Sequence, residues 1–298
     1  MARTPVHETG DPDFSETTTN IELDQSMRIL KPVSAICLTI VWAGACAATG
    51  GEAAQPVQIN QARDQSSSAA AKATPKLLAG VVHLSDNDIR FRTADGVSVF
   101  VDPVAGPTNE LVMKSGMLKP DLILITHGHP DHYKPAVLRE YQALNPKAIV
   151  ACPANVAARA AKKRVINLEQ VKPGQSYTMA GIRFQTVPAC FLEGDSHPRT
   201  NDWVGYVLQL NGASYYVTGD TQPLPEMAKV KADVLFPLLY GCGGNLEQAV
   251  KMSVLTKASV VVPVHTGGQE EVIKKYLSQL PTGVQGAYYK NAELIASP

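Results

Sequence analysis

The sequence lacks a net charge, a regular cysteine pattern and a hydrophobic run of membrane-spanning length. Its 27 Lys and Arg offset 27 Asp and Glu, which disfavours a nucleic-acid binder because phosphate affinity comes largely from clustered positive charge. Five cysteines without close regular spacing exclude a disulfide framework and a cysteine-rich zinc module. An apolar content of 45%, with only 22 Gly and 21 Pro, also excludes a collagen-like or wholly disordered chain.

The first part of the chain divides by composition. Residues 1–26 are polar and acidic without an apolar period, so we expect a disordered leader or a misassigned upstream extension. Arg28 and Lys31 then flank an apolar run of 13 residues, 33–45. This run is shorter than the roughly 20 residues of a transmembrane helix, and with its basic flank it predicts a signal sequence over 27–47.

The end of the signal sequence allows two kinds of processing. Cleavage after Ala45-Cys46-Ala47 would release a soluble protein, whereas Ala43-Gly44-Ala45-Cys46 resembles a lipoprotein box with lipid on Cys46. Either route predicts an exported protein, periplasmic or lipid-anchored in a bacterial envelope, with membrane contact only through that lipid. Residues 48–76 are rich in Ala, Gln, Ser and Gly and predict a flexible linker.

Residues 77–298 have the size of a single layered α/β domain. Short apolar runs predict strands at 97–101, 122–126, 148–151, 182–187, 204–210, 215–218, 234–236 and 260–262. Helical patterns cover 135–144, 154–163, 246–256 and 269–280. Asn211-Gly212 predicts a hairpin turn. Because a hairpin accompanies alternating strands and helices, we expect α/β layers rather than a purely parallel sheet.

The segment from Thr126 to His132 is the strongest local signal. It contains four potential metal ligands directly after an apolar strand: His127, His129, Asp131 and His132. Imidazole and carboxylate groups suit zinc, manganese or iron, and the absence of cysteine from the segment disfavours a structural thiolate site. The sequence therefore predicts a metal site at the end of this strand.

Two later strands end on further candidate ligands. Asp220 follows the strand at 215–218, and His265 follows the strand at 260–262. Taken alone, Asp220 could be a turn or helix-capping residue, and His265 a polar residue of the core. Because both stand at the same kind of strand end as the first cluster, we expect them to belong to the same metal site.

These motifs resemble the metallo-β-lactamase fold superfamily from about Val81 to the C-terminus. The resemblance rests on three segments: His127-x-His129-x-Asp131-His132, Gly219-Asp220-Thr221 and Pro263-Val264-His265. Within the superfamily the chain is most similar to the branch of L-ascorbate-6-phosphate lactonase-like hydrolases, on the further segments 101–103, 120–125 and 203–207. The resemblance implies a four-layer αββα sandwich with a metal site at one edge of the two sheets.

The resemblance also implies two divalent metal ions, with zinc expected and manganese or iron(II) as alternatives. His127 and His129 would hold the first ion, while Asp131, His132 and His265 would hold the second. Asp220 would bridge the two. The family's first ion takes a third histidine.

His197 is the only histidine between residues 132 and 265, so we assign it as the third histidine of the first ion. Cys190 and Asp195 remain as alternatives.

The predicted chemistry is hydrolysis. Two metal ions can lower the pKa of a bridging water, and the metal-activated hydroxide would attack an ester, lactone or phosphoester of a small molecule. Asp131 is the expected catalytic residue, because in the family it sits beside that water. Asp102 is a candidate to orient a histidine ligand, or is simply a turn residue before Pro103.

Two other functions stay open: a nuclease or phosphodiesterase of the same fold, and a non-catalytic metal-binding protein. The chain departs from the branch at 240–245, Tyr-Gly-Cys-Gly-Gly-Asn, and at Thr266. These positions line the pocket in relatives, so the resemblance does not fix the substrate. The sequence predicts no oligomeric state.

Overall fold

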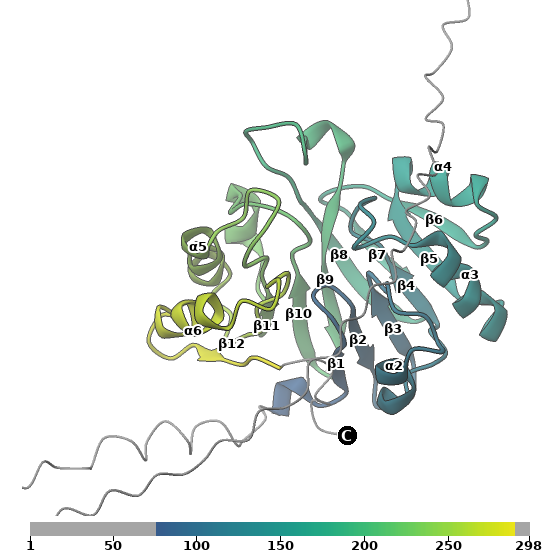
Figure 1. Ribbon diagram of the computed structural model, residues 1–298, viewed down its shortest axis with the longest axis horizontal. Helices are drawn as coiled ribbons and strands as arrows, with labels where there is room; N and C mark the ends of the chain where they lie inside the picture. Colours follow the sequence, from purple (N-terminus) through teal and green to yellow (C-terminus); the bar gives the residue numbers. More distant parts are fainter. Residues whose placement is uncertain (1–75, 290–298) are drawn as a thin grey trace, which may run out of the picture. The chain divides into compact units, whose positions relative to one another are not determined.

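The computed structural model describes residues 76–289 (Figure 1). The predicted leader, signal sequence, lipid site at Cys46 and nearly all of the linker lie outside the described residues. Within the described part, no helix is long and apolar enough to cross a membrane.

Two mixed sheets form the centre of the structure (Figure 1). The first has the order β1 (Val81–His83), β2 (Ile89–Arg92), β3 (Ser98–Val101), β4 (Leu122–Leu124), β5 (Ile149–Pro153) and β6 (Leu168–Val171). Its strands from β3 to β6 pair in parallel, and the others pair antiparallel.

In the second sheet the parallel strands come first in the strand order, whereas in the first sheet they come last. That order is β13 (Gln285–Gly286), β12 (Val260–Val261), β11 (Val234–Phe236), β10 (Ala213–Val217), β9 (Val204–Leu210), β8 (Ile182–Pro188) and β7 (Ser176–Met179). Strands β10 to β13 pair in parallel, and β7 to β10 pair antiparallel.

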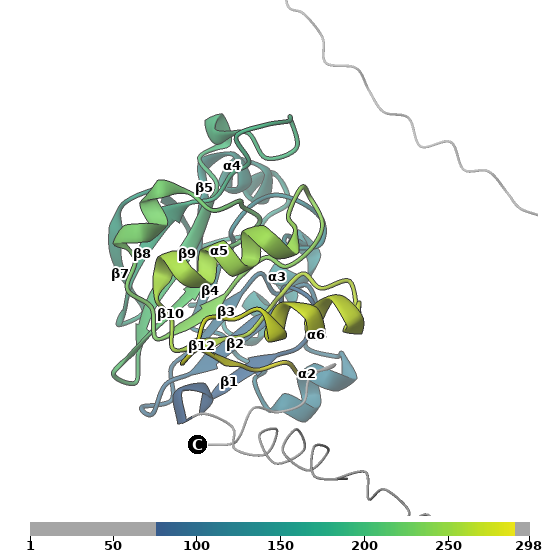
Figure 2. The same ribbon diagram turned by 90° about the vertical axis from the view of Figure 1, so that its left-hand side faces the viewer.

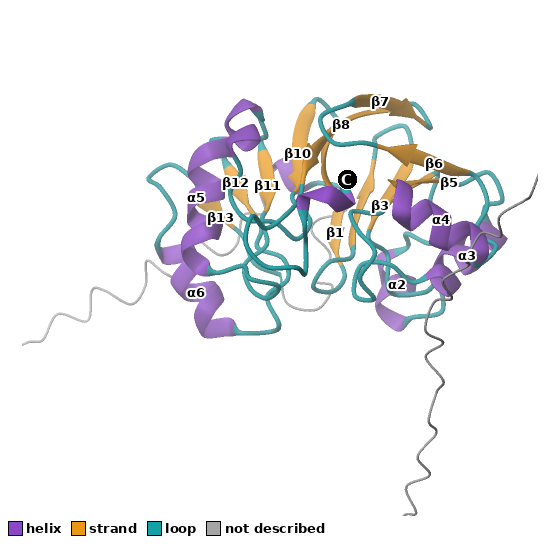
Figure 3. Cartoon of the chain, turned by 90° about the horizontal axis from the view of Figure 1, so that it is seen from above, coloured by secondary structure: helices purple, strands orange, loops and turns teal. Residues whose placement is uncertain are grey.

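Helices cover the outer face of each sheet (Figures 2 and 3). On the first sheet they are α2 (Glu110–Ser115), α3 (Pro135–Leu144) and α4 (Ala154–Lys162). On the second they are α5 (Leu246–Thr256) and α6 (Glu270–Ser278). The described chain also contains the short 3-10 turns η1 (Lys76–Leu78), η2 (Arg199–Asn201) and η3 (Pro225–Lys229). The predicted four-layer αββα sandwich is confirmed.

The alternation of side chains along the parallel strands explains the layers. In β4, Leu122 and Leu124 join the core between the sheets, whereas Ile123 joins the cluster beneath the helices. In β11, Val234 and Phe236 face the same central core, whereas Leu235 faces α5 and α6. Because successive side chains point to opposite faces, an uninterrupted apolar strand is the pattern of a sheet that is covered on both sides.

The strongly apolar strands and long helices agree closely with the sequence predictions. β9 and β11 have the predicted bounds, as do α3 and α5. The predicted hairpin turn joins β9 to β10, with φ of +52° at Asn211 and +78° at Gly212. Both residues are in the left-handed region that a two-residue hairpin of this type requires.

The sequence analysis did not predict six short elements, which are α2, β1, β2, β6, β7 and β13. β6 and β7 have several exposed residues and little apolar content. β2 contains the fully buried Arg90, whose charge is compensated by Asp88 at 2.8 Å. These strands have only two to four residues, too few for a pattern to identify them, and they are stabilised by pairing with strands elsewhere in the chain.

Phe91 provides a test of the packing between the sheets. Its ring on β2 contacts Tyr215 and Phe236 of the other sheet edge-to-face, at centroid distances of 5.3 and 5.9 Å. We expect Phe91→Ala to lower the free energy of unfolding by about 3–5 kcal/mol, because it leaves a cavity between the sheets. Chemical denaturation measures the loss. Val254→Ala, at a side chain that is 54% exposed, should change it by less than about 0.5 kcal/mol. Equal losses in the two variants would contradict this packing.

Candidate metal centre

The structure brings the seven predicted ligand residues to one edge of the two sheets. They are His127, His129, Asp131, His132, His197, Asp220 and His265. The first four lie in the loop after β4, and the others come from the β8–β9 loop and from the ends of β10 and β12. The carboxyl ends of parallel strands meet at the same edge of a sheet, which is where α/β folds build their sites.

The side chains form two groups that share a carboxylate. The three-histidine group consists of His127, His129 and His197, whose ligand atoms all lie within 4.8 Å of one another. The mixed group consists of Asp131, His132 and His265 and meets the same limit.

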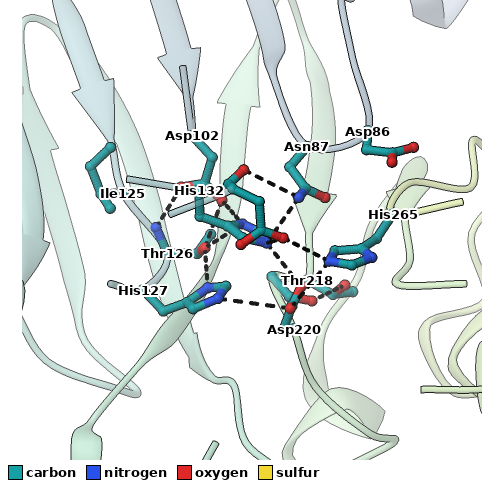
Figure 4. Close-up of polar contacts among 12 residues, drawn as sticks. Asp86, Asn87, Asp102, Ile125, Thr126, His127, His132, Thr218, Asp220 and His265 are labelled. Carbon is teal, nitrogen blue, oxygen red and sulfur yellow. Dashed lines mark hydrogen bonds and ion pairs between the residues drawn. The ribbon is translucent and has the colours of Figure 1, made fainter. Parts of the chain in front are cut away.

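Asp220 lies between the two groups. Figure 4 shows it beside His127 of the three-histidine group and beside His132 and His265 of the mixed group. Its Oδ1 is 3.3 Å from Nε2 of His132, in the mixed group. Its Oδ2 is 3.5 Å from Nε2 of His197 and 3.8 Å from Nε2 of His127, in the three-histidine group, and 3.5 Å from Nε2 of His265. The two carboxylate oxygens can therefore serve two neighbouring cations.

The environment of Asp220 shows that these residues fit a metal ion. The side chain is only 2% exposed, and its Oδ2 has no hydrogen-bond partner although three imidazole nitrogens surround it. An unsatisfied buried carboxylate oxygen is costly, because its lost hydration is not replaced. A divalent cation between this oxygen and the imidazole nitrogens would replace it, and this donor set is one that zinc, manganese and iron accept.

Asp102 and Thr126 orient two of the histidines (Figure 4). Asp102 follows β3, and its Oδ2 lies 2.8 Å from Nδ1 of His132 and 2.6 Å from the Thr126 hydroxyl. The carboxylate accepts the hydroxyl proton, so Thr126 Oγ1 can accept from Nδ1 of His127 at 2.9 Å. With Nδ1 protonated, each ring presents Nε2 to the centre. The expected orienting contact of Asp102 is confirmed.

Burial and neighbouring charges shift the pKa values of the buried groups in different directions. Burial holds the pKa of His127 well below its ordinary value, so the ring is neutral. Burial alone would also lower the pKa of His132, but the Asp220 and Asp102 carboxylates raise it to about 10. Burial would raise the pKa of Asp220, yet the neighbouring imidazoles, His132 foremost, keep it well below its usual range. The carboxylate at the centre is therefore ionised.

Asp131 differs from Asp220 in its access to solvent. Its side chain is 53% exposed, and its Oδ2 lies 3.1 Å from Nε2 of His265. The hydrogen bond from His265 lowers the pKa of Asp131 to about 2. The exposed carboxylate of the centre is thus charged and reachable from outside.

Strained turns place the ligands after their strands. Asp102 and His265 have φ of +47° and +52°, in the left-handed region where Asp and His are among the more tolerated residues. Gly219, just before Asp220, has φ of +62°, and a Cβ there would lie 3.0 Å from Cβ of Thr126. Glycine is therefore required for the close approach of these two strand ends.

The structure adds residues that sequence reasoning did not find. Asn87, between β1 and β2, places its amide nitrogen 2.9 Å from Nε2 of His132. Its neighbour Asp86 accepts hydrogen bonds from the backbone of His265 and from Thr266, which fixes the His265 turn. The sequence predicted no strand on either side of this loop, because β1 and β2 are only three and four residues long.

Trp203 covers the three-histidine group. Its ring centroid lies 5.0 to 5.1 Å from the rings of His127, His129 and His197. The sequence analysis included this residue only in the segment 203–207, which supports the family resemblance. The indole shields one side of the three imidazoles from water.

The geometry favours His197 over the alternatives for the third histidine position. His197 is fully buried, and its Nε2 lies 3.3 Å from Nε2 of His127. Among the described residues, neither Cys190 nor Asp195 joins a group of potential metal ligands.

Comparisons with known proteins match the chain to relatives named as metal-dependent hydrolases. A family model described as a beta-lactamase superfamily domain matches residues 98–266, more than half of the chain. A UPF0173 metal-dependent hydrolase of Methanopyrus kandleri is 28% identical over 183 residues, 58% of this chain and 78% of the relative. The corresponding protein of Thermococcus kodakarensis is 29% identical over 182 residues, 56% of this chain and 76% of the relative.

A solved structure shares the fold. It is Igni18, a metallo hydrolase of Ignicoccus hospitalis, with a TM-score of 0.59 and 19% identity. The match covers 72% of this chain and 95% of that one.

Removing the charge of Asp102 tests the orienting contact. We expect Asp102→Asn to weaken the binding of a divalent ion such as zinc about 10–100-fold. Asp102 accepts with both oxygens, one from the Thr126 backbone and the other from His132 and the Thr126 hydroxyl, and the amide has only one uncharged acceptor oxygen. Calorimetric metal titration measures the change. Asp121→Asn is a matched control, since Asp121 Oδ2 accepts from Ser98 at the opposite end of the β3–β4 pair. Unchanged affinity in the Asp102 variant would refute the role of this contact.

Proposed function

The chain belongs to the beta-lactamase superfamily, and on that premise we propose that it is a metal-dependent hydrolase of small-molecule esters, lactones or phosphoesters. The position of Asp220 carries this proposal. Its two buried oxygens lie between two groups of ligands, as a carboxylate shared by two divalent ions requires. The name of the Methanopyrus kandleri relative, a metal-dependent hydrolase, supports the reaction class.

The three-histidine group would hold one ion and the mixed group the other, with Asp220 contacting both. When bound, two such ions lower the pKa of water towards neutrality and stabilise negative charge that develops on a substrate oxygen. Zinc is the metal we propose, because imidazole nitrogens make up most of the ligand set.

The chain's own residues prepare this chemistry. Asp102 and Thr126 hold protons on Nδ1 of His132 and His127, so that Nε2 of each ring faces the centre. Trp203 excludes water from one side of the three-histidine group. Asp131 is the exposed carboxylate of the centre, and its Oδ2 can accept a proton from water or pass one to a leaving group.

The surroundings of the centre support a small organic substrate. The β8–β9 loop, which carries His197, exposes 60% of Leu192, and the loop after β11 exposes 48% of Tyr240. The two loops are neighbours, because a Cβ on Gly243 would lie 3.3 Å from the Phe191 ring. Apolar side chains beside a polar catalytic group are typical of small-molecule sites.

The proposed function is tested with the purified full chain. We expect about two divalent ions per chain, and zinc-restored, chelator-sensitive turnover on at least one of three panels: lactones, carboxylic esters or phosphodiesters. Asp220→Ala should lose both bound metal and activity. Fewer than one ion per chain would refute the two-ion centre. Bound metal without chelator-sensitive turnover on any panel would show a binding protein rather than an enzyme.

Asp131 is tested separately from metal binding. We expect Asp131→Asn to lower kcat by about a hundredfold or more, because the amide cannot accept the proton. Because Asp131 also belongs to the mixed group of ligands, metal analysis gives the number of bound ions, and kcat is compared between samples that hold the same number. Asp195→Asn changes an exposed acid of the neighbouring β8–β9 loop and should leave kcat within about twofold of the parent. A full kcat in the Asp131 variant would rule out proton transfer by this residue.

A further inference from the structure

The loop from Tyr240 to Asn245 is fixed against the metal centre. The backbone nitrogen of Tyr240 donates to the carbonyl of His265 at 3.1 Å, and Gly244 donates back to Gly241 at 2.7 Å. The loop is therefore a tight turn tied to the backbone of a ligand residue. Its position relative to the centre is set by these hydrogen bonds.

Two glycines bring the backbone of this turn directly onto neighbouring rings. A Cβ on Gly241 would lie 2.9 Å from Cε1 of His265, and a Cβ on Gly243 would lie 3.3 Å from the ring of Phe191. Between them stands Cys242, with φ of +52°. Cys242 is thus the one residue with a side chain between these two glycines, and that side chain is a thiol.

The thiol reaches the proposed ligands. Ligand atoms of Cys242, His197 and Asp220 all lie within 4.8 Å of one another. His197 is fully buried, and Asp220 is 2% exposed with the unpartnered Oδ2 described above. This unpartnered oxygen indicates, independently of the thiol, that a cation would bind beside Cys242.

Cys242 is a free thiol, as are Cys152 and Cys190, the other cysteines of the described part of the chain. Cys152 and Cys190 are buried, whereas Cys242 lies at the surface beside the centre. Burial and the neighbouring Asp220 carboxylate raise the pKa of this thiol to about 12, so it stands beside the centre in its protonated form.

We propose that Cys242 is a sulfur ligand of the ion that His197 and Asp220 hold, and that it makes this centre selective for zinc over manganese. The inference rests on the proposed function, because it requires that the centre binds metal. On binding, the S–H proton leaves to solvent and a sulfur lone pair forms the bond to the ion. Thiolate is a soft donor that favours zinc, whereas manganese prefers oxygen ligands. The segment from Thr126 to His132 contains no cysteine, so the sequence alone disfavoured a thiolate site. In the folded chain the sulfur comes instead from the loop after β11.

Cobalt substitution tests the proposal with a readout other than activity. In the cobalt-loaded full chain we expect a near-ultraviolet absorption band from sulfur-to-cobalt charge transfer. Cys242→Ser keeps the size of the side chain and should lose the band while cobalt remains bound. Cys152→Ala, which removes a buried thiol on the outer face of the first sheet, should keep it.

Metal competition gives the second measurement. The ratio of zinc to manganese affinity should fall about tenfold or more in Cys242→Ser, the size of effect that removal of a group supporting a metal commonly has. A wild-type protein that binds cobalt without the band, or a band that persists in Cys242→Ser, would overturn the thiol ligand alone. A wild-type protein that binds no metal would overturn the proposed function as well.

Discussion

A buried carboxylate oxygen that lacks a hydrogen-bond partner is the constraint on which the centre depends. Asp220 is 2% exposed, and its Oδ2 faces three imidazole nitrogens at 3.5 to 3.8 Å. Protein interiors rarely tolerate such a group, because the lost hydration must be replaced. The surrounding histidines complete a set of imidazole donors around this oxygen. A cation is the partner that this arrangement lacks.

The fold supplies the other requirements of the centre through its strand ends. Strands β3, β4, β10 and β12 finish at one edge, and the turns after them deliver Asp102, the histidine cluster, Asp220 and His265. Asp102 fixes His132 directly and His127 through Thr126, so one buried carboxylate sets two ligand rings. Rigid strands covered on both faces by apolar side chains keep these contacts in register.

The sequence predicted the parts of this structure that local pattern determines. Apolar strands such as β9 and β11 and the ligand-rich loop after β4 are readable because their residue types follow one another in the chain. Asn87, Trp203 and Cys242 could not be placed, because their contacts with the centre join segments far apart in sequence. For the same reason the sequence left Cys190 and Asp195 as alternatives to His197 for the third ligand position. The packing of the β8–β9 loop decides between them, because it brings only His197 close to the other ligands.

The central claim is that this edge holds two divalent ions that share Asp220. Anomalous diffraction at the zinc edge, from crystals of the zinc-loaded full chain, tests it most directly. We predict two anomalous peaks, one bounded by His127, His129 and His197 and the other by Asp131, His132 and His265, with an oxygen of Asp220 beside each. No peak at this edge, or a single peak that Asp220 does not contact, would contradict the claim.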